Sequence, residues 1–196
     1  MPRQMLLAWD LGQANDASIV MVSELTNGVI TVTDVHKLPE RTSYVDQCEM
    51  VAELMKTHHA SLILDKTGSV GVADMVKKKG IIATEVMWTG GSKESRDGNK
   101  INLPKEQGVM AVTLALQSGK LKVTQFCRNR ELLRKEMQEF GVKYGANGKC
   151  TYDGVSSHDD TVSALMLTCY FWSKQVATGR KYQILGAQRG RGFDWG

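Results

Sequence analysis

The chain has 196 residues, 42% of them hydrophobic and 23% charged, which suits one medium-sized soluble globular domain with a substantial core. Its apolar runs are too short to span a membrane, its first residues lack a signal-peptide pattern, and its four cysteines show no CxxC spacing typical of a zinc site. The scattered cysteines suit a reducing cytoplasm, and the net charge of +4 gives mild support for a polyanionic partner.

The first half of the chain predicts three consecutive strands and then alternating helices and strands. QMLLAWDLG is typical of a short strand that ends in an acid and a glycine; ASIVMVSEL and GVITVTDVHKL follow, joined by a hairpin signal at Asn27-Gly28. We then expect a helix in YVDQCEMVAELMKTHH, a buried strand in SLILD, a helix in VGVADMVKKKG and a strand in IIATEVMW. This order predicts a mixed central sheet, antiparallel at first and then parallel, with helices on its faces.

The second half begins with TGGSKESRDGNKINLPK at residues 89–105, whose polarity and lack of periodicity predict a mobile loop. A helix follows, with Pro104 near its first turn and Gly119 at its end. Then come a strand in LKVTQ, a helix in NRELLRKEMQEFG and a hairpin in VKYGANGKCTYDG. The last helix is expected from about Ser157. We assign one α/β domain to residues 1–176 and a basic, glycine-containing tail to residues 177–196, which we expect to be flexible or to bind a partner.

Acidic residues stand where elements of the predicted sheet begin or end. Asp10 closes the first strand, Asp65 closes the fourth, and Asp159 and Asp160 stand at the start of the last helix, in SSHDDTVSALML. In a mixed sheet of this order the first and fourth strands commonly lie side by side and parallel, so we expect their acids to lie together near the late pair. Converging carboxylates repel one another, and divalent cations with oxygen ligands relieve that repulsion. The pattern predicts a site for two Mg²⁺ or Mn²⁺ ions, which can activate water for phosphodiester hydrolysis.

Each acid also has a simpler structural interpretation. A single Asp at a strand end is commonly a turn residue, and an Asp pair at a helix start is commonly a cap; the combination at these points favours the metal site. His158 is either an auxiliary residue beside the metal or a structural residue at the helix start. The remaining acids, Asp34 among them, are interpreted as turn or surface residues. Basic residues of the loop are candidates for sequence-independent contacts with DNA phosphates: Lys93, Arg96, Lys100 and Lys105.

In this order and at these separations, LAWDLGQANDASIVMV, LILDKTGSVG and SSHDDTVSALML resemble the nuclease domain of phage terminase large subunits. The similarity covers about residues 5–172. It implies a ribonuclease H-like fold and a two-metal endonuclease that cuts concatemeric double-stranded viral DNA during genome packaging in the host cell cytoplasm, together with portal or other packaging proteins. Carried over residue by residue, it makes Asp10, Asp65 and the Asp159–Asp160 pair catalytic metal ligands, with Asp160 favoured as the direct ligand and Asp159 assisting.

Complete large terminases also carry an ATPase motor before the nuclease, but this sequence contains no G-x-x-x-x-G-K-[ST] phosphate loop. We therefore assign no ATP-driven translocation to the chain, which is expected to be an excised domain or a free-standing nuclease. A Holliday-junction resolvase shares the fold and the late acid pair and remains an alternative, as does a non-catalytic DNA-binding or portal-binding module. An actin-like ATPase also begins with an Asp-x-Gly strand, but this chain is too short for its two similar halves.

Overall fold

The computed structural model describes residues 4–12, 17–67, 71–144, 150–154 and 159–178. Its first three strands are β1 (Gln4–Asp10), β2 (Ile19–Thr26) and β3 (Val29–Lys37), which pair as an antiparallel meander. Asn27 and Gly28 between β2 and β3 have φ values of 52° and 76°, as a tight two-residue hairpin turn requires. The hairpin expected from this dipeptide is therefore confirmed.

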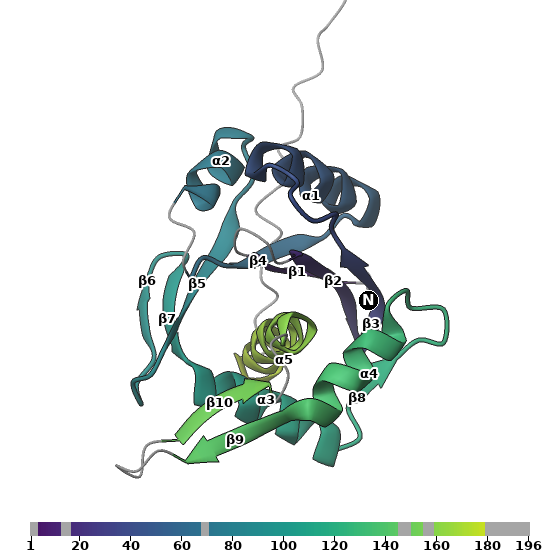
Figure 1. Ribbon diagram of the computed structural model, residues 1–196, viewed down its shortest axis with the longest axis vertical. Helices are drawn as coiled ribbons and strands as arrows, with labels where there is room; N and C mark the ends of the chain where they lie inside the picture. The colour runs from purple at the N-terminus through teal and green to yellow at the C-terminus, as the bar shows by residue number, and fades with distance from the viewer. Residues whose placement is uncertain (1–3, 13–16, 68–70, 145–149, 155–158, 179–196) are drawn as a thin grey trace, which may run out of the picture.

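Eight strands form one mixed sheet in the order β6-β7-β5-β4-β1-β2-β3-β8 (Figure 1). The strands β4 (Ser61–Asp65), β5 (Ala83–Thr89) and β7 (Lys100–Pro104) continue outward from β1 and run parallel to it. Trp9 of β1 is in register with Leu64 of β4, so the next residue of each strand closes it at the same edge of the sheet. These two closing residues are Asp10 and Asp65. The predicted mixed sheet is confirmed.

Helices cover both faces of this sheet (Figure 1). The helices are α1 (Tyr44–His58), α2 (Val72–Lys78), α3 (Lys105–Gln117), α4 (Arg130–Glu139) and α5 (Asp160–Thr178). Leu7 and Trp9 pack with α1 and α2, whereas Leu6 and Ala8 pack with α3, α4 and α5. Because side chains alternate along a strand, Asp10 projects to the same face as Leu6 and Ala8. That face is the one covered by α5, the helix that starts with the late acids.

The segment 89–105 differs from the predicted mobile loop. It contains β6 (Ser95–Asp97), which pairs antiparallel with β7, and β7 in turn extends the parallel part of the sheet. Ile101 and Leu103 are buried while Lys100 and Asn102 are exposed, which is the alternation of an outer strand. This alternation is only a few residues long and is flanked by glycines and charged residues, so the segment as a whole shows no periodicity. The expectation of a loop is wrong for β6 and β7.

The remaining elements follow the predicted order. The strand β8 (Leu121–Val123) pairs with the outer side of β3, and β9 (Phe140–Tyr144) pairs with β10 (Cys150–Gly154) as a separate hairpin. The last helix is described from Asp160 to Thr178. Residues 157 and 158, with which we expected that helix to open, and residues 179–196 of the tail lie outside the described residues. No helix in the described ranges has the length and apolar character needed to cross a membrane.

Candidate active site

The structure brings the carboxyl groups of Asp10 and Asp65 together at the end of β1 and β4. Their exposed fractions are 8% and 7%, and they lie close enough to share a hydrogen bond. Burial, and then the charges of Asp65 and Asp160, raise the pKa of Asp10 well above its usual value. Two neighbouring buried carboxyl groups need a proton or a cation between them, because both cannot carry a charge there without compensation.

Asp65 also has the turn role that its position in the sequence suggested. Its Oδ1 accepts a hydrogen bond of 2.7 Å from the backbone N–H of Thr67, as in an Asx turn. The hydroxyl of Thr67 in turn accepts a 2.9 Å hydrogen bond from the backbone N–H of Trp88 at the end of β5. Burial raises the pKa of Asp65, although the hydrogen bonds from Thr67 act in the opposite direction. The structural role therefore fixes this acid in place and leaves it beside Asp10.

The chain that follows Asp10 is held by the first turn of α1. The backbone N–H of Gly12 donates to Ser18 Oγ at 3.0 Å, and Ser18 Oγ donates to Gln47 Oε1 at 2.6 Å. Tyr44 adds a hydrogen bond of 3.3 Å from its hydroxyl to the carbonyl of Gly12. Ser18 and Gln47 are both buried, so these bonds form away from solvent. No local pattern in the sequence indicates this contact, because Gln47 lies 29 residues after Ser18.

The late acids lie beside this pair but make different contacts. Asp160 is the first residue of α5, and its charge acts on Asp10 more strongly than that of Asp159. Asp159 Oδ2 forms an ion pair of 3.2 Å with Lys105 Nζ. Lys105 is the first residue of α3, directly after β7, and its Nζ lies 5.9 Å from the ring centroid of Phe140. One late acid is thus neutralised by a lysine of the chain.

The other predicted basic residues lie just before β6 or on the hairpin of β6 and β7. Lys93, Arg96 and Lys100 are exposed, and Lys100 begins β7 at the strand end opposite to Lys105. The preceding Glu94 forms a 2.9 Å ion pair with Lys174, far along α5 from its first residue. Among the described side chains, therefore, Lys105 is the predicted cation that contacts an acid of the site. His158 lies outside the described residues.

The donor atoms at the end of β1 and β4 suit a hard divalent cation. They are carboxylate oxygens on buried and mutually repelling groups, which is the chemistry that Mg²⁺ and Mn²⁺ prefer. Within the part of the chain that the structure describes, no three His, Cys, Asp or Glu side chains converge into a group that could hold a metal ion. Asp10 and Asp65 are in direct contact, whereas the late pair acts on Asp10 through its charges. Asp159 of that pair also forms an ion pair with Lys105.

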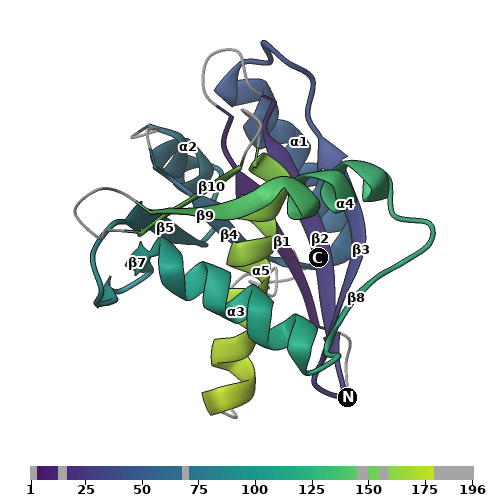
Figure 2. The same ribbon diagram turned by 60° about the horizontal axis from the view of Figure 1, so that its bottom comes forward.

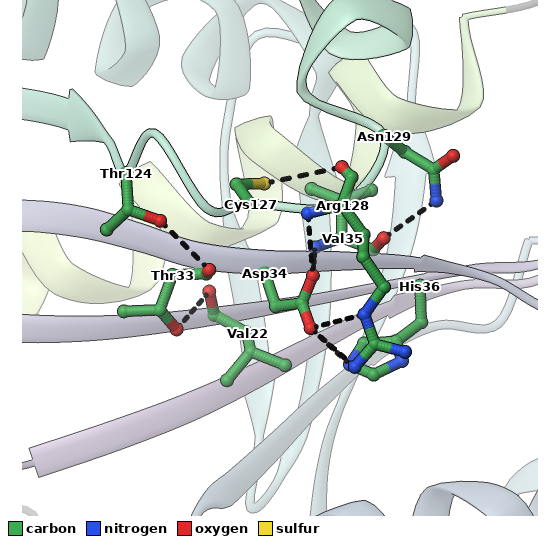
Figure 3. A network of polar contacts seen from close by, with 9 residues as sticks. All are labelled: Val22, Thr33, Asp34, Val35, His36, Thr124, Cys127, Arg128 and Asn129. Atoms are coloured by element: carbon green, nitrogen blue, oxygen red, sulfur yellow. Dashed lines mark hydrogen bonds and ion pairs between the residues drawn. The ribbon is translucent and has the colours of Figure 1, made fainter.

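Asp34, which we expected to be a turn or surface acid, has a clear structural role (Figure 3). Asp34 lies within β3, where its Oδ1 accepts a 3.0 Å hydrogen bond from the backbone N–H of Arg128 and its Oδ2 a 2.9 Å bond from Arg128 Nε. Asn129 Nδ2 donates to the carbonyl of Val35 at 2.9 Å, and His36 Nε2 lies 3.3 Å from Asp34 Oδ2. The interpretation of Asp34 as a turn or surface acid is wrong, because it ties the segment before α4 to the sheet.

A mixed sheet that starts with an antiparallel meander, with acids closing its first and fourth strands and opening its last helix, defines the ribonuclease H-like class. Comparison with known families agrees with this assignment. The family model of the terminase RNaseH-like domain matches residues 7–169, and the chain belongs to this family. The resemblance found from the sequence is therefore confirmed. A comparison with curated proteins finds no match.

Solved structures of phage terminases share the fold. The large terminase nuclease from thermophilic phage G20c is 21% identical with a TM-score of 0.67, over 85% of this chain and 81% of that one. The same nuclease with bound magnesium gives a TM-score of 0.67, over 86% of this chain and 81% of that one. The large terminase from another thermophilic bacteriophage is 14% identical with a TM-score of 0.64, over 90% of this chain but 41% of that one. At these sequence identities the similarity supports the fold alone.

Proposed function

We propose that the chain is a metal-dependent endonuclease that cleaves double-stranded DNA, as the nuclease part of a viral genome-packaging terminase in the host cell cytoplasm. The observation that carries this proposal is the contact between two buried carboxyl groups, Asp10 and Asp65, at the ends of adjacent parallel strands. Membership of the terminase RNaseH-like family supports the packaging role. The G20c nuclease described with bound magnesium, and again with bound cobalt, supports a need for divalent metal.

Asp10, Asp65 and Asp160 are the residues that would hold the proposed pair of metal ions. When bound, Mg²⁺ or Mn²⁺ supplies a Lewis acid that activates water and offsets the charge developing on the phosphodiester. Asp10 suits a central place among these ligands because it lies beside Asp65 and is also affected by the charge of Asp160. The turn at Thr67 holds the Asp65 carboxylate in place, so this ligand needs little rearrangement.

The ion pair between Lys105 and Asp159 supports Asp160 as the direct ligand of the late pair and Asp159 as an assisting residue. Lys105 neutralises Asp159, which lowers the number of uncompensated negative charges beside Asp10. A DNA phosphate that enters the site adds a further negative charge, and we propose that Lys105 contacts it. We propose that the exposed Lys93, Arg96 and Lys100 contact backbone phosphates further from the cut, without reading the sequence.

Cleavage of plasmid DNA with Mn²⁺ or Mg²⁺ tests the proposal. We expect Asp65→Asn to slow cleavage by roughly a hundredfold or more, because it removes a carboxylate that stabilises the transition state through the metal. Asp97→Asn is the matched control, since Asp97 is an exposed acid on β6. Equal rates for Asp65→Asn and the parent protein contradict a catalytic role for this site.

A DNA-binding or portal-binding module without catalysis is the second candidate. The observation that favours it is the ion pair of Lys105 with Asp159, which supplies an internal cation beside the acids. Calorimetric titration with Mn²⁺ distinguishes the two, because a nuclease binds the ion and loses this binding in Asp10→Asn. A comparison of four-way junctions with linear duplex tests the resolvase alternative, since a resolvase prefers junctions and cuts them as a dimer.

A further inference from the structure

Asp159 directly precedes α5 and Asp160 opens its first turn, whose N–H groups have no acceptors within the helix. Thr161 follows Asp160 directly, and its backbone N–H donates to Glu136 Oε2 at 2.9 Å. The Thr161 hydroxyl donates to the same oxygen at 2.5 Å. Glu136 is 6% exposed and Thr161 is fully buried, so both hydrogen bonds form in the interior. A single carboxylate oxygen thus holds both the backbone and the side chain of this turn.

Glu136 belongs to another helix, which separates this contact from an ordinary helix cap. In most helices the side chain just before the first turn accepts such an N–H group. Here Asp159 occupies that position and gives its backbone carbonyl to Ser163 N–H at 2.8 Å, while its carboxylate pairs with Lys105. Glu136 of α4 is the acceptor for Thr161, while the Asp159 carboxylate pairs with Lys105 and the charge of Asp160 acts on Asp10.

The helix that carries Glu136 is itself anchored to the sheet. Before α4 begins, Arg128 is bound to Asp34 of β3, and the Asn129 carbonyl accepts from Leu133 N–H at 3.0 Å. Leu133 is 1% exposed and packs in the core with α5. In Figure 2, α4 runs from the edge at β3 towards the N-terminal end of α5. A continuous set of contacts therefore connects the sheet, α4 and the first turn of α5.

We propose that Glu136 is a positioning residue for the metal site, which rests on the proposed nuclease function. By binding both donors of Thr161, it fixes the first turn of α5 and keeps Asp160 beside Asp10. Such a restraint is needed because the carboxylates of Asp160 and Asp10 repel each other. The charge-assisted hydrogen bonds to Glu136 offset that repulsion, since bonds to a carboxylate are shorter and stronger than neutral ones.

Three variants test this role. Glu136→Ala removes both hydrogen bonds, and Glu136→Gln keeps an amide oxygen that can accept from Thr161. Glu131→Ala is the matched control, because Glu131 lies on the same helix but is exposed and pairs with Arg134 at 2.8 Å. Calorimetry with Mn²⁺ measures metal affinity, and hydrogen exchange of the Thr161 and Ser163 amides in metal-free protein measures the order of the turn. Cleavage assays separate kcat from KM for DNA.

We expect Glu136→Ala to bind Mn²⁺ about ten- to a hundredfold more weakly, as found when groups that orient metal ligands are removed. Its kcat falls while KM for DNA changes little, and the Thr161 and Ser163 amides exchange faster. Glu136→Gln recovers most of the lost affinity, and Glu131→Ala behaves as the parent. A purely structural role for Glu136 predicts a lower unfolding temperature but unchanged Mn²⁺ affinity in the folded fraction.

Unchanged Mn²⁺ affinity and unchanged amide exchange in Glu136→Ala overturn the inference. If Glu136→Ala does not fold, Thr161→Val decides instead, because it removes the hydroxyl donor and keeps the backbone N–H. Thr161→Val should weaken Mn²⁺ binding by roughly threefold or more, and parental affinity overturns the inference. If the parent protein binds no Mn²⁺, both the proposed function and this inference are wrong. If the parent binds Mn²⁺ and cleaves DNA, and Glu136→Ala does both equally well, only this inference is wrong.

Discussion

Each carboxyl group of the candidate site is costly to bury, and its acidic neighbours add to that cost. Asp10 and Asp65 are buried against each other, and the late acids lie close by. Lys105 relieves part of this charge through its 3.2 Å ion pair with Asp159. A lysine in this position has two effects, because it compensates an acid and also raises the local positive potential that a second cation meets. The balance between these effects can be measured.

We expect Lys105→Ala to bind Mn²⁺ several-fold more tightly than the parent protein, because a competing positive charge beside the acids is removed. The same variant should bind DNA more weakly, with a salt dependence smaller by about one phosphate contact. Calorimetry measures the first effect and fluorescence anisotropy at several salt concentrations the second. Lys100→Ala removes the same charge at the other end of β7. Equal changes of Mn²⁺ affinity in both variants contradict a local role for Lys105.

Residues of the site differ in how far the sequence could reveal them. Asp10 and Asp65 could be predicted because strand order alone determines which strand ends meet. Glu136 and Gln47 could not, since each acts on a partner more than twenty residues away, at separations of 25 and 29. Their contacts depend on how α4 and α1 pack, and no local spacing encodes that packing. The ranking of Asp159 and Asp160 likewise depends on the position of Lys105, which is 54 residues from Asp159.

Polar contacts as well as apolar packing connect β3, β8 and α4. Partial burial raises the pKa of Asp34, but hydrogen bonds from the backbone and side chain of Arg128 outweigh this effect and lower it. A lowered pKa in the folded state means that folding favours the charged carboxylate. The resulting stability is complete above the pKa of the unfolded chain, about 3.9. It is lost as the pH falls through the lower pKa of the folded protein.

Asp34→Asn should therefore lower the free energy of unfolding by about 1–2 kcal/mol at pH 7, the usual contribution of hydrogen bonds to a charged group at a partly exposed position. The difference from the parent protein should shrink as the pH falls below about 4. Urea unfolding measured at a series of pH values between 7 and 3 follows this change. Asp97→Asn, at an exposed position on β6, serves as the control. A difference that stays constant over the whole series argues against the carboxylate charge as its source.

Elements with long apolar patterns could be predicted, and short outer strands could not. The meander, α1, β4 and α3 follow from turn signals and helical spacing in the sequence. In contrast, β7 has only two buried apolar residues, Ile101 and Leu103, before Pro104, and it becomes a strand because β5 offers a free edge to pair with. Asp34 was misassigned for a related reason. Its partner Arg128 lies 94 residues away, and a partly buried strand acid has no local signature.

At the scale of the whole molecule, the fold concentrates negative charge at one edge of the sheet, although the chain carries a net charge of +4. Such an arrangement destabilises the metal-free protein, because buried like charges oppose folding. A cation that binds only the folded state recovers this energy through linkage. Stability and metal binding should therefore change in opposite directions when an acid of the pair is made neutral, as is common at functional sites.

We expect Asp10→Asn to change thermal unfolding in opposite directions without and with metal. Without metal, the variant should unfold a few degrees above the parent protein, because about 1 kcal/mol of relieved repulsion shifts the midpoint of a domain of this size by roughly 2–4 °C. With Mn²⁺ in excess, the parent should gain stability and the variant should not. Asp97→Asn should follow the parent in both conditions, since its carboxylate is exposed on β6. An Asp10→Asn variant that is less stable without metal, or that gains as much from Mn²⁺ as the parent, shows that the contact of Asp10 with Asp65 serves the fold rather than a cation.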